Sequence, residues 1–389
     1  MPKTNNSIIH RTRLVDSVND ALTFWRGVVL VGPRQVGKTT LAQQLIGRKS
    51  PNYFDLEDPR DLARLADPML TLEAMNGLVV IDEVQHRPQL FEMLRVLMDR
   101  PEKIKLPGQY LLLGSAAPAL LQQTTESLLG RVKTIEVSGF NIQEVGMTAA
   151  CQNQLWLRGG FPQAFTAPSD ATSMDWRMSS IQSFLQRDLP QLGISASPSA
   201  MLRFWRMLCH YHGQIWNAAE PARSMGVNET TVRRYLDNLT DTFMVRQLQP
   251  WFENLGKRQV KSPKIYIRDS GFLHALLSIT TKDDLWHHPL CGASWEGFAM
   301  EQVLRIAKPD EAYFWATHQG AELDLLMLRG NQRIGVEFKR TDSPTVTRSM
   351  RTAIDDLKLD ALYVVHAGDL RFPLADGIEA VPLWALVDA

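Results

Sequence analysis

The stretch VVLVGPRQVGKTTL, residues 28–41, decides the fold of the first part of the chain. Its four leading apolar residues are typical of a buried strand, and a short loop leads from them into a helical pattern. Gly32, Gly37, Lys38 and Thr39 match the spacing G-x-x-x-x-G-K-S/T. Glycines at these places let successive backbone N–H groups curl around a phosphate, and the start of the next helix adds positive potential. The stretch therefore predicts a phosphate-binding loop between a strand and a helix.

The chemistry of such a loop assigns an expected role to its last residues. We expect Lys38 to reach the β- and γ-phosphates of a nucleotide and the hydroxyl of Thr39 to bind Mg²⁺. ATP and Mg²⁺ are therefore the predicted cofactors. The residues expected to surround the phosphates are Gly32, Pro33, Arg34, Gln35, Val36, Gly37, Lys38, Thr39 and Thr40.

A second motif, LVVIDEV at residues 78–84, places two acids at the end of an apolar run. Asp82 is predicted to hold Mg²⁺ through its water shell, and Glu83 to orient and polarise the attacking water. Strand ends often carry charge, so this motif gains its meaning from the loop that precedes it. Together the two motifs predict hydrolysis of ATP.

Two further residues are candidates for the same chemistry. The run QYLLLGSAA predicts a third strand, and Ser115 at its tip could sense the γ-phosphate. A serine that only starts a turn or caps a helix is the alternative. Arg131, in SLLGRV, could stabilise transition-state charge on the nucleotide of a neighbouring subunit. An isolated surface arginine is the alternative for that residue.

The composition restricts the class of protein. The chain has 389 residues, of which 44% are hydrophobic, and its 42 Lys and Arg balance 42 Asp and Glu. The length predicts two or three domains, and a net charge of zero means that any basic surface must be local. Three scattered cysteines argue against a disulfide framework, and no apolar run is long enough to predict a membrane-spanning helix. We expect a cytoplasmic protein that does not associate with membranes.

The pattern of predicted secondary structure changes twice along the chain. Residues from about 14 to 145 alternate short apolar runs with helical patterns, which predicts a mostly parallel sheet covered on both faces. Residues from about 151 to 268 are mainly helical, and strands return from about residue 290. The later strands are expected at Ala312–Trp315, Leu323–Leu328, Gly335–Phe338 and Ala361–His366, flanked by helices at Trp295–Ile306 and Val346–Leu357.

The middle segment has the pattern of a helix-turn-helix. One helix is expected to reach Met225, Gly226 would make the turn, and Asn228 would cap a second helix. Residues 201–268 hold eleven Lys and Arg against five Asp and Glu, and a local positive excess is typical of nucleic-acid binding. The predicted DNA contacts are Asn228, Thr230, Thr231, Arg233, Arg234, Lys257 and Arg258. A module that packs only against protein is the alternative.

The C-terminal segment carries a second group of acids, in GAELDLLMLRGNQRIGVEFKR at residues 320–340. Alternation places Glu337 and Lys339 on one face of a strand, and a hairpin can bring Asp324 beside them. Glu296, on the preceding helix, could complete the set. Carboxylates beside a lysine suit Mg²⁺-assisted phosphodiester hydrolysis. The alternative is a structural pair of Glu337 and Lys339 in a scaffold that does not cleave.

The motifs GPRQVGKTTL, VVIDEVQ, LLLGSAA and SLLGRV resemble those of AAA-type ATPases that carry a C-terminal DUF4143 domain. The resemblance continues through GGFPQAF, RDL and SPKIYIRDSG to GAELDLL and GVEFKR, and so covers nearly the whole chain. It implies an AAA+ fold in which Lys38 is the Walker A lysine and Asp82 and Glu83 form Walker B. It also implies that Ser115 is the sensor and that Arg131 is the arginine finger of a ring, with a hexamer as one option. SAA after Gly114 departs from relatives that carry a second polar residue there.

The D…ExK elements of the C-terminal segment look like those of the PD-(D/E)XK nuclease fold. The predicted architecture is therefore an AAA+ P-loop ATPase domain (1–147), a helical and winged-helix-like domain (148–285) and an α/β restriction-endonuclease-like domain (286–389). The predicted function is ATP-driven binding or remodelling of DNA by a homo-oligomer, with branched DNA as one option for the substrate and helicase-like or branch-migration-like action as one option for the activity. Two alternatives are an ATP-gated protein-interaction or signalling scaffold and a metal-dependent nuclease that the ATPase regulates.

Overall fold

The computed structural model describes residues 9–47, 49–101, 106–114, 126–191, 194, 196–252 and 260–388. The chain forms two compact units. The first holds Met1–Gly139 with Asp241–Phe243, and the second holds Phe140–Thr240 with Met244–Ala389. The predicted boundary between residues 285 and 286 lies inside the second unit, and the division into three domains stays a prediction.

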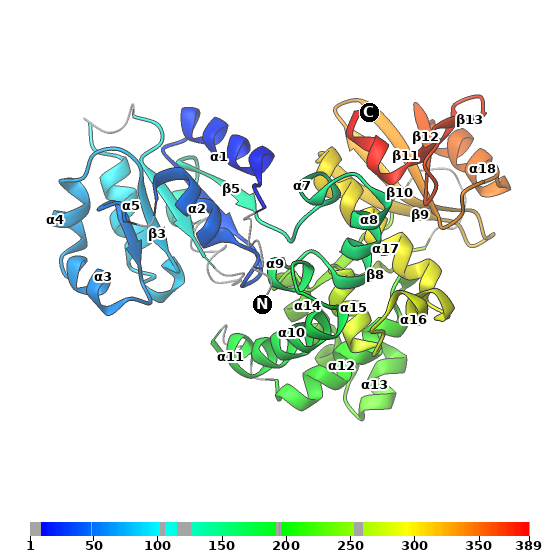
Figure 1. The fold of residues 1–389 in the computed structure, drawn as a ribbon, viewed down its shortest axis with the longest axis horizontal. Coiled ribbons are helices and arrows are strands. Elements are labelled where there is room, and N and C mark those ends of the chain that lie inside the picture. Colours follow the sequence, from blue (N-terminus) through cyan, green and yellow to red (C-terminus); the bar gives the residue numbers. More distant parts are fainter. Residues whose placement is uncertain are drawn as a thin grey trace. The chain divides into compact units, whose positions relative to one another are not determined.

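A five-stranded parallel sheet forms the centre of the first unit (Figure 1). Its strand order is β2-β3-β4-β1-β5, with every neighbouring pair parallel. Strands β1, β3 and β4 bury every residue, and because successive side chains point to opposite faces, both faces of the sheet are covered. This confirms the predicted α/β core. The strands are β1 (Gly27–Val31), β2 (Tyr53–Asp55), β3 (Val79–Asp82), β4 (Tyr110–Leu113) and β5 (Val132–Glu136).

The helices of the first unit follow local sequence signals. The side chain of Asp58 caps one of them by accepting a hydrogen bond from the N–H of Arg60, and Pro59 occupies its first position. Another helix, α5, buries an apolar stripe that includes Leu94 and Leu97. The helices are α1 (Thr12–Phe24), α2 (Lys38–Ile46), α3 (Pro59–Arg64), α4 (Pro68–Glu73) and α5 (Leu90–Met98).

The second unit begins with helices whose packing depends on close contacts between two glycines and an aspartate. Asp269 accepts hydrogen bonds from the N–H groups of Gly160 (2.8 Å) and Phe272 (3.0 Å). A Cβ on Gly159 would lie 2.1 Å from Oδ1 of Asp269, so only glycine fits there. The motifs GGFPQAF and RDSG therefore serve packing. The helices are α7 (Ile142–Val145), α8 (Ala149–Arg158), α9 (Pro162–Phe165), α10 (Asp170–Ser183), α11 (Leu189–Gln191), α12 (Pro198–His210), α15 (Ser270–Leu276) and α16 (Lys282–His287).

The predicted helix-turn-helix pattern corresponds to two short helices of the second unit. Helix α13 (Ala219–Met225) ends before Gly226, which has a φ of 69°, and α14 (Glu229–Asp241) follows. An antiparallel sheet of order β6-β8-β7 accompanies them. Its strands are β6 (Gln214–Ile215), β7 (Val245–Leu248) and β8 (Lys264–Ile267).

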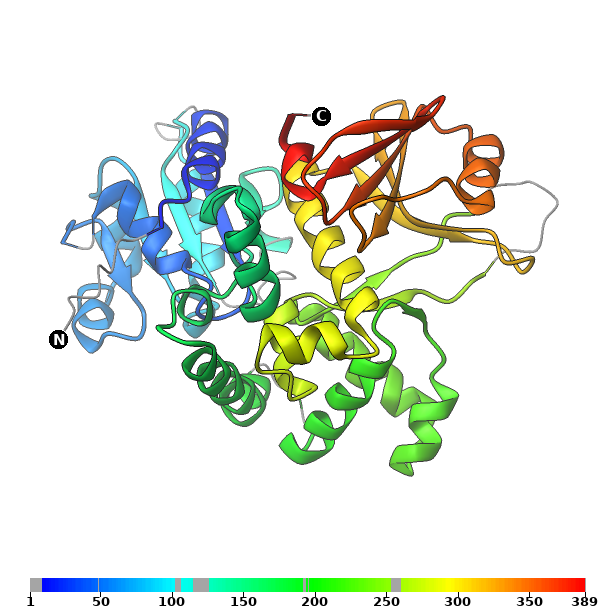
Figure 2. The ribbon, with the colours of Figure 1, turned by 45° about the vertical axis from the view of Figure 1, so that its right-hand side comes forward.

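A six-stranded mixed sheet of order β13-β14-β12-β11-β10-β9 forms the C-terminal part of the same unit. Helices α17 (Cys291–Ala307) and α18 (Arg348–Leu357) pack against it (Figure 2). The ends of the expected strands and helices lie at most four residues from the observed ones, and β12 has the expected ends. The strands are β9 (Glu311–Ala316), β10 (Glu322–Arg329), β11 (Gln332–Lys339), β12 (Ala361–His366), β13 (Phe372–Ala375) and β14 (Ile378–Pro382).

Two predictions made from composition concern cysteines and membranes. Cys151, Cys209 and Cys291 are free thiols, as their scattered positions predict. Across the described ranges, no helix has both the length and the apolar character needed to cross a membrane.

Candidate functional site

The phosphate-binding loop joins β1 to α2 at the carboxyl edge of the parallel sheet. A Cβ on Gly32 would lie 2.1 Å from the carbonyl oxygen of Val137, so the loop can pass this backbone only as glycine. Gly37 precedes α2 with a φ of 95°, a left-handed conformation that glycine adopts without strain. The two glycines of the motif are thus required by the path of the loop.

The ammonium group of Lys38 lies inside the curl of this loop. Its Nζ donates hydrogen bonds to the carbonyl oxygens of Gly32 (2.9 Å) and Pro33 (2.8 Å). The side chain is buried, with 7% of its residue surface exposed. Lys38 is therefore held beside the backbone that a phosphate would contact.

Thr39 and Asp82 meet beside the loop, as the motifs predict. The Thr39 hydroxyl donates to Oδ2 of Asp82 (2.8 Å), and the N–H of Glu83 donates to Oδ1 (2.9 Å). The hydroxyl of Tyr53, on β2, also donates to Oδ2 of Asp82 (2.7 Å). Burial raises the pKa of Asp82, while the bonds from Tyr53 and Thr39 oppose that rise. All three donors are neutral, so none of them offsets a negative charge on the carboxylate.

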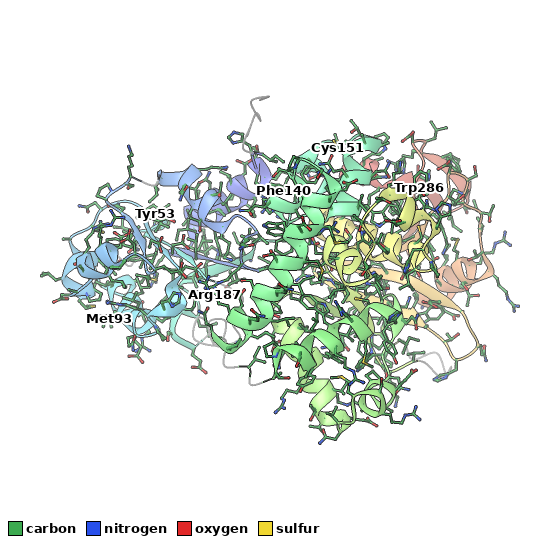
Figure 3. All side chains as sticks on the ribbon, turned by 60° about the horizontal axis from the view of Figure 1, so that its bottom comes forward. Tyr53, Met93, Phe140, Cys151, Arg187 and Trp286 are labelled. Atoms are coloured by element: carbon green, nitrogen blue, oxygen red, sulfur yellow. The ribbon has the colours of Figure 1, made fainter. Side chains whose placement is uncertain are left out.

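Tyr53, which is labelled in Figure 3, is a site residue that the motifs did not predict. Burial and the neighbouring Asp82 raise the pKa of its phenol above the ordinary value, so it acts as a donor at neutral pH. The sequence marks Tyr53 only by its place in a short apolar run that ends in Asp55, which predicts a strand but not a contact with Asp82. Strand pairing supplies the rest, because Asp55 lies beside Asp82 in the parallel register of β2 and β3.

Glu83 follows the strand in a strained conformation. Its φ is 54°, which non-glycine residues rarely adopt and which costs on the order of 1–3 kcal/mol. The carboxylate accepts a hydrogen bond from the amide of Gln85. Strain of this kind concentrates at functional sites, because it aims a side chain where regular strand geometry would not.

Other residues brace the loop from outside. Arg11, which the motifs did not predict, donates to the carbonyl oxygens of Val36 (3.3 Å) and Ser138 (2.9 Å). Arg34 pairs with Glu57, from which its guanidinium lies 3.6 Å away. The remaining predicted loop residues, Gln35 and Thr40, lie in the loop and in the first turn of α2.

Arg131 lies at the opposite edge of the same sheet. It precedes Val132, which pairs with Gly27 at the start of β1, whereas the phosphate-binding loop follows the end of β1. The length of the strand, about 13 Å, separates the two. The Arg131 guanidinium binds Asp99 through two hydrogen bonds of 2.8 and 2.5 Å. Ser115, the other candidate for this chemistry, lies outside the described residues.

A hollow of about 320 Å³ adjoins Arg131. Phe24 and Leu106 line it, and both side chains are exposed, as is the nearby Leu129. The hollow therefore combines an arginine with apolar side chains that face solvent.

The second helix of the predicted helix-turn-helix presents a polar face. Val232, Tyr235, Leu236 and Leu239 are buried, as their spacing predicts. Asn228 caps α14 by accepting a hydrogen bond from the N–H of Thr231 (2.8 Å). The exposed predicted contacts are Asn228, Thr230, Arg233 and Arg234, and Thr231 is half-buried. Lys257 and Arg258 lie outside the described residues.

The positive excess of this segment does not all face solvent. Arg246 and Arg268 both bind the carboxylate of Glu301 on α17, which is 1% exposed. Burial alone would raise the pKa of Glu301, but the arginines hold it far below its ordinary value. Lys264 is also buried, at 3% exposure. The charge count from sequence therefore overstates the basic surface, because it includes cations that neutralise buried carboxylates.

The C-terminal acids come together as the hairpin predicts. Asp324 lies one step beyond the paired residues Leu325 and Val336, which brings it opposite Glu337. Nζ of Lys339 lies 2.7 Å from Glu337 and 3.9 Å from Asp324. Burial raises the pKa of Glu337 to about 7, and the negative charge of Asp324 adds to the rise.

Glu296, on α17, lies near the same acids, and the ammonium group of Lys264 lies between its carboxylate and that of Asp324. Nζ of Lys264 lies 3.7 Å from Glu296 and 3.8 Å from Asp324, and it also contacts Glu322. The hydroxyl of Tyr266 donates to Glu296 (2.6 Å). Burial raises the pKa of Glu296 to about 7. Sequence reasoning missed Lys264 here, because it counted that residue only among the eleven Lys and Arg of residues 201–268.

These contacts test whether the acids fit a metal ion. Among the residues that the structure describes, no three His, Cys, Asp or Glu side chains are grouped so that they could hold one. Two ammonium groups lie among the carboxylates, that of Lys264 at 3.8 Å and that of Lys339 at 3.9 Å from Asp324. The predicted ligand set of Glu296, Asp324 and Glu337 is therefore close in space but does not fit a metal as it stands.

Three family models match the chain. An AAA domain matches residues 25–146, the domain of unknown function DUF8612 matches residues 151–283, and the domain of unknown function DUF4143 matches residues 291–386. Uncharacterized proteins of Mycobacterium tuberculosis and Mycobacterium bovis are each 52% identical over 356 residues, covering 91% of this chain and 79% of their own length. Among solved structures, the Walker-type ATPase of Pyrococcus abyssi is 16% identical with a TM-score of 0.49. The match covers 71% of this chain and 98% of that one.

Proposed function

The chain belongs to the family of AAA-domain proteins with a C-terminal DUF4143 domain, and on that premise we propose that its first unit binds and hydrolyses ATP with Mg²⁺. One observation carries the proposal. Thr39 and Tyr53 direct two hydroxyls at Asp82 beside a loop that already holds the Lys38 ammonium. An aspartate with a purely structural role would have no reason to lie beside both the ammonium group of Lys38 and the hydroxyl of Thr39.

Each residue of this group has a role in the proposed reaction. Thr39 and Asp82 would hold Mg²⁺, which when bound would neutralise charge on the β- and γ-phosphates. Lys38 would exchange the carbonyl oxygens of Gly32 and Pro33 for phosphate oxygens, which are stronger acceptors because they are charged. The glycine-rich backbone would donate its N–H groups to the same phosphates.

Glu83 would act on water. Its carboxylate can accept a hydrogen bond from a water molecule and so orient that molecule toward the γ-phosphate. The left-handed backbone at this residue turns the carboxylate away from the strand direction. Gln85 binds the carboxylate in this structure, so the glutamate would exchange that amide for water before hydrolysis.

We propose that the site is completed by a second copy of the chain. Arg131 lies at the far edge of the sheet from the loop of its own chain, so it could serve only the nucleotide of a neighbour. Exposed Phe24, Leu106 and Leu129 near it supply apolar area for such a contact. A homo-oligomeric ring, with a hexamer as one option, would place each Arg131 at the next subunit's phosphates.

Mixing two inactive variants tests this arrangement. Arg131→Ala should bind ATP but lack the arginine, and Lys38→Ala should keep the arginine but lack nucleotide binding. Mixed oligomers should recover part of the wild-type ATPase rate, because one protein supplies the loop and the other the arginine. Oligomers shown to contain both proteins yet to remain inactive would argue against Arg131 as a finger.

We propose DNA as the partner of the middle segment. The element order α12, β6, α13, α14, β7, β8 is that of a winged helix, and α14 would be its recognition helix. Thr230, Arg233 and Arg234 are exposed near the start of α14, where such helices contact bases and phosphates. A scaffold that binds protein through the same face is the other candidate function.

The rate of ATP hydrolysis in the presence of single-stranded, duplex and four-way DNA separates these functions. DNA binding coupled to hydrolysis should raise the rate with at least one of these, and the effect should fall steeply with salt because phosphate contacts release counterions. A rate that no DNA changes, with no DNA bound at low salt, would favour the protein scaffold.

A further inference from the structure

Lys264 is a buried cation within the C-terminal group of acids, although it comes from the small sheet of the middle segment. Its residue surface is 3% exposed. Its ammonium lies within 4 Å of carboxylates from two other elements, Glu296 on α17 and Asp324 on β10. It also contacts Glu322, and it lies 5.5 Å from the centre of the Phe314 ring.

The backbone of Lys264 is fixed from both sides. It lies on β8, the central strand of the sheet β6-β8-β7, and pairs with Ile215 on one side and Leu248 on the other. The side chain therefore cannot withdraw by a shift of a loop. Lys339 differs, because it ends β11 and its side chain is 37% exposed, so it can turn toward solvent.

The acids near Lys264 also accept hydrogen bonds from neutral donors, but the ammonium is what opposes a metal ion. Asp324 accepts a hydrogen bond from the N–H of Phe338 (3.0 Å), and Glu296 accepts one from Tyr266 (2.6 Å). A divalent ion binds carboxylate oxygens at about 2.0–2.6 Å, so an ion on Asp324 and Glu296 would lie close to the ammonium of Lys264. Repulsion between two cations so near each other, in a buried place, would oppose such binding.

We infer that the ammonium of Lys264 occupies the place among Glu296, Glu322 and Asp324 that a divalent cation takes in a metal-dependent nuclease. The C-terminal sheet is then no metal nuclease. Lys264 instead joins the three-stranded sheet to α17 and β10, and Arg246 and Arg268 reinforce the joint through Glu301. Asp324 of the D…ExK pattern, together with Glu296 and Glu322, serves to fasten the helix-turn-helix segment to the C-terminal sheet.

We expect the C-terminal acids to bind no Mn²⁺ in a chain whose ATP site has been disabled. Asp82→Asn serves as the background, because it removes the acid of the ATP site. Electron paramagnetic resonance at about 1 mM Mn²⁺ should detect no bound ion in this variant beyond loose surface binding. An ion that stays bound in Asp82→Asn, and is lost when Asp324→Asn is added, would overturn the inference.

Removing the lysine should create the metal site. In the Asp82→Asn background, Lys264→Met keeps most of the side-chain volume but removes the charge, so it should bind one Mn²⁺ at least ~10-fold more tightly than its parent. Lys261→Met, which removes an exposed lysine three residues away, is the matched control and should gain nothing. A folded Lys264→Met that gains no ion would contradict the inference.

A cleavage assay provides a measurement that needs no substitution of a buried residue. The wild-type chain with Mn²⁺ and plasmid or four-way DNA should leave every strand intact. Cleavage that disappears in Lys339→Ala would overturn the inference. If Lys264→Met does not fold, as judged by circular dichroism, the Mn²⁺ count and the cleavage assay decide the question.

Discussion

Asp82 and Asp324 are both buried aspartates that a sequence motif marks as metal-binding, yet they have opposite surroundings. Asp82 receives hydrogen bonds from the hydroxyls of Thr39 and Tyr53, which carry no charge. Asp324 has the ammonium groups of Lys264 and Lys339 within 4 Å. A carboxylate with neutral donors keeps its attraction for a cation, whereas one beside two ammonium groups has lost most of it. The difference shows that a motif predicts where an acid lies, while its neighbours decide what the acid binds.

The largest expected effect concerns the nucleotide site. Glu83→Gln should still bind ATP but hydrolyse it at least ~100-fold more slowly, because a neutral amide cannot polarise water as a carboxylate does. Single-turnover ATP hydrolysis measures the change. Glu92→Gln, an exposed neighbour on α5, should hydrolyse ATP as the wild type does. If Glu83→Gln hydrolysed ATP at the wild-type rate, Glu83 would not be the residue that polarises the attacking water.

The next effect concerns stability at the C-terminal acids. Lys264→Ala should lower the free energy of unfolding by about 3 kcal/mol, because it leaves buried carboxylates without their cation. Urea unfolding of the second unit measures the loss. Lys261→Ala should stay within about 0.5 kcal/mol of the wild type, since that side chain is exposed. Equal losses in both variants would mean that Lys264 does not neutralise the acids.

The acids themselves should make stability depend on pH. Burial raises the pKa of Glu296 to about 7 from an ordinary value of 4.5. The folded state therefore holds a proton that the unfolded state releases, so this contribution is present below about pH 4.5 and is lost as pH rises through about 7. Relative to the wild type, Glu296→Gln should gain roughly 1–2 kcal/mol between pH 5 and pH 8.

Urea unfolding at several pH values measures this trend. Glu311→Gln, at an exposed position on β9, is the matched control and should keep the wild-type slope. A Glu296→Gln variant whose stability falls with pH as steeply as that of the wild type would mean that Glu296 is ionised throughout.

The smallest expected effect concerns DNA binding, and it compares exposed arginines with arginines that bind a buried carboxylate. Arg233 and Arg234 are exposed on α14, whereas Arg246 and Arg268 bind the buried Glu301. Replacing Arg233 and Arg234 with alanine should weaken DNA binding roughly tenfold and reduce its salt dependence by about two phosphate contacts. A salt titration of DNA binding measures both quantities.

The control for this pair lies on another exposed helix face. Arg348 and Arg351 on α18, replaced together by alanine, remove the same charge and should leave the salt dependence unchanged. If both double variants weaken binding alike, the effect comes from net charge and not from α14.

Local signals were enough to predict much of the fold. The strand before the phosphate-binding loop, the hairpin from Asp324 to Glu337 and the turn at Gly226 depend on residues that are neighbours in sequence. Each of these elements was located to within a few residues. The contact of Thr39 with Asp82 also followed, because parallel strands end at a shared edge.

The contacts that decide the chemistry are not local. Tyr53 reaches Asp82 only through the pairing of β2 with β3, and Lys264 reaches Asp324 across 60 positions of sequence. No periodicity marks either residue. A count of charges assigned Lys264 to a basic surface, whereas burial assigns it to the acids, and only the packing of β8 against α17 distinguishes the two.

The most direct test of the account is the number of Mn²⁺ ions that the Glu83→Gln chain binds with and without ATP. This variant should hold ATP without hydrolysing it, so its metal site can be counted by electron paramagnetic resonance. We expect one tightly bound ion per chain that appears with ATP and is lost when Asp82→Asn is added. A second ion that needs no ATP and is lost when Asp324→Asn is added would contradict it.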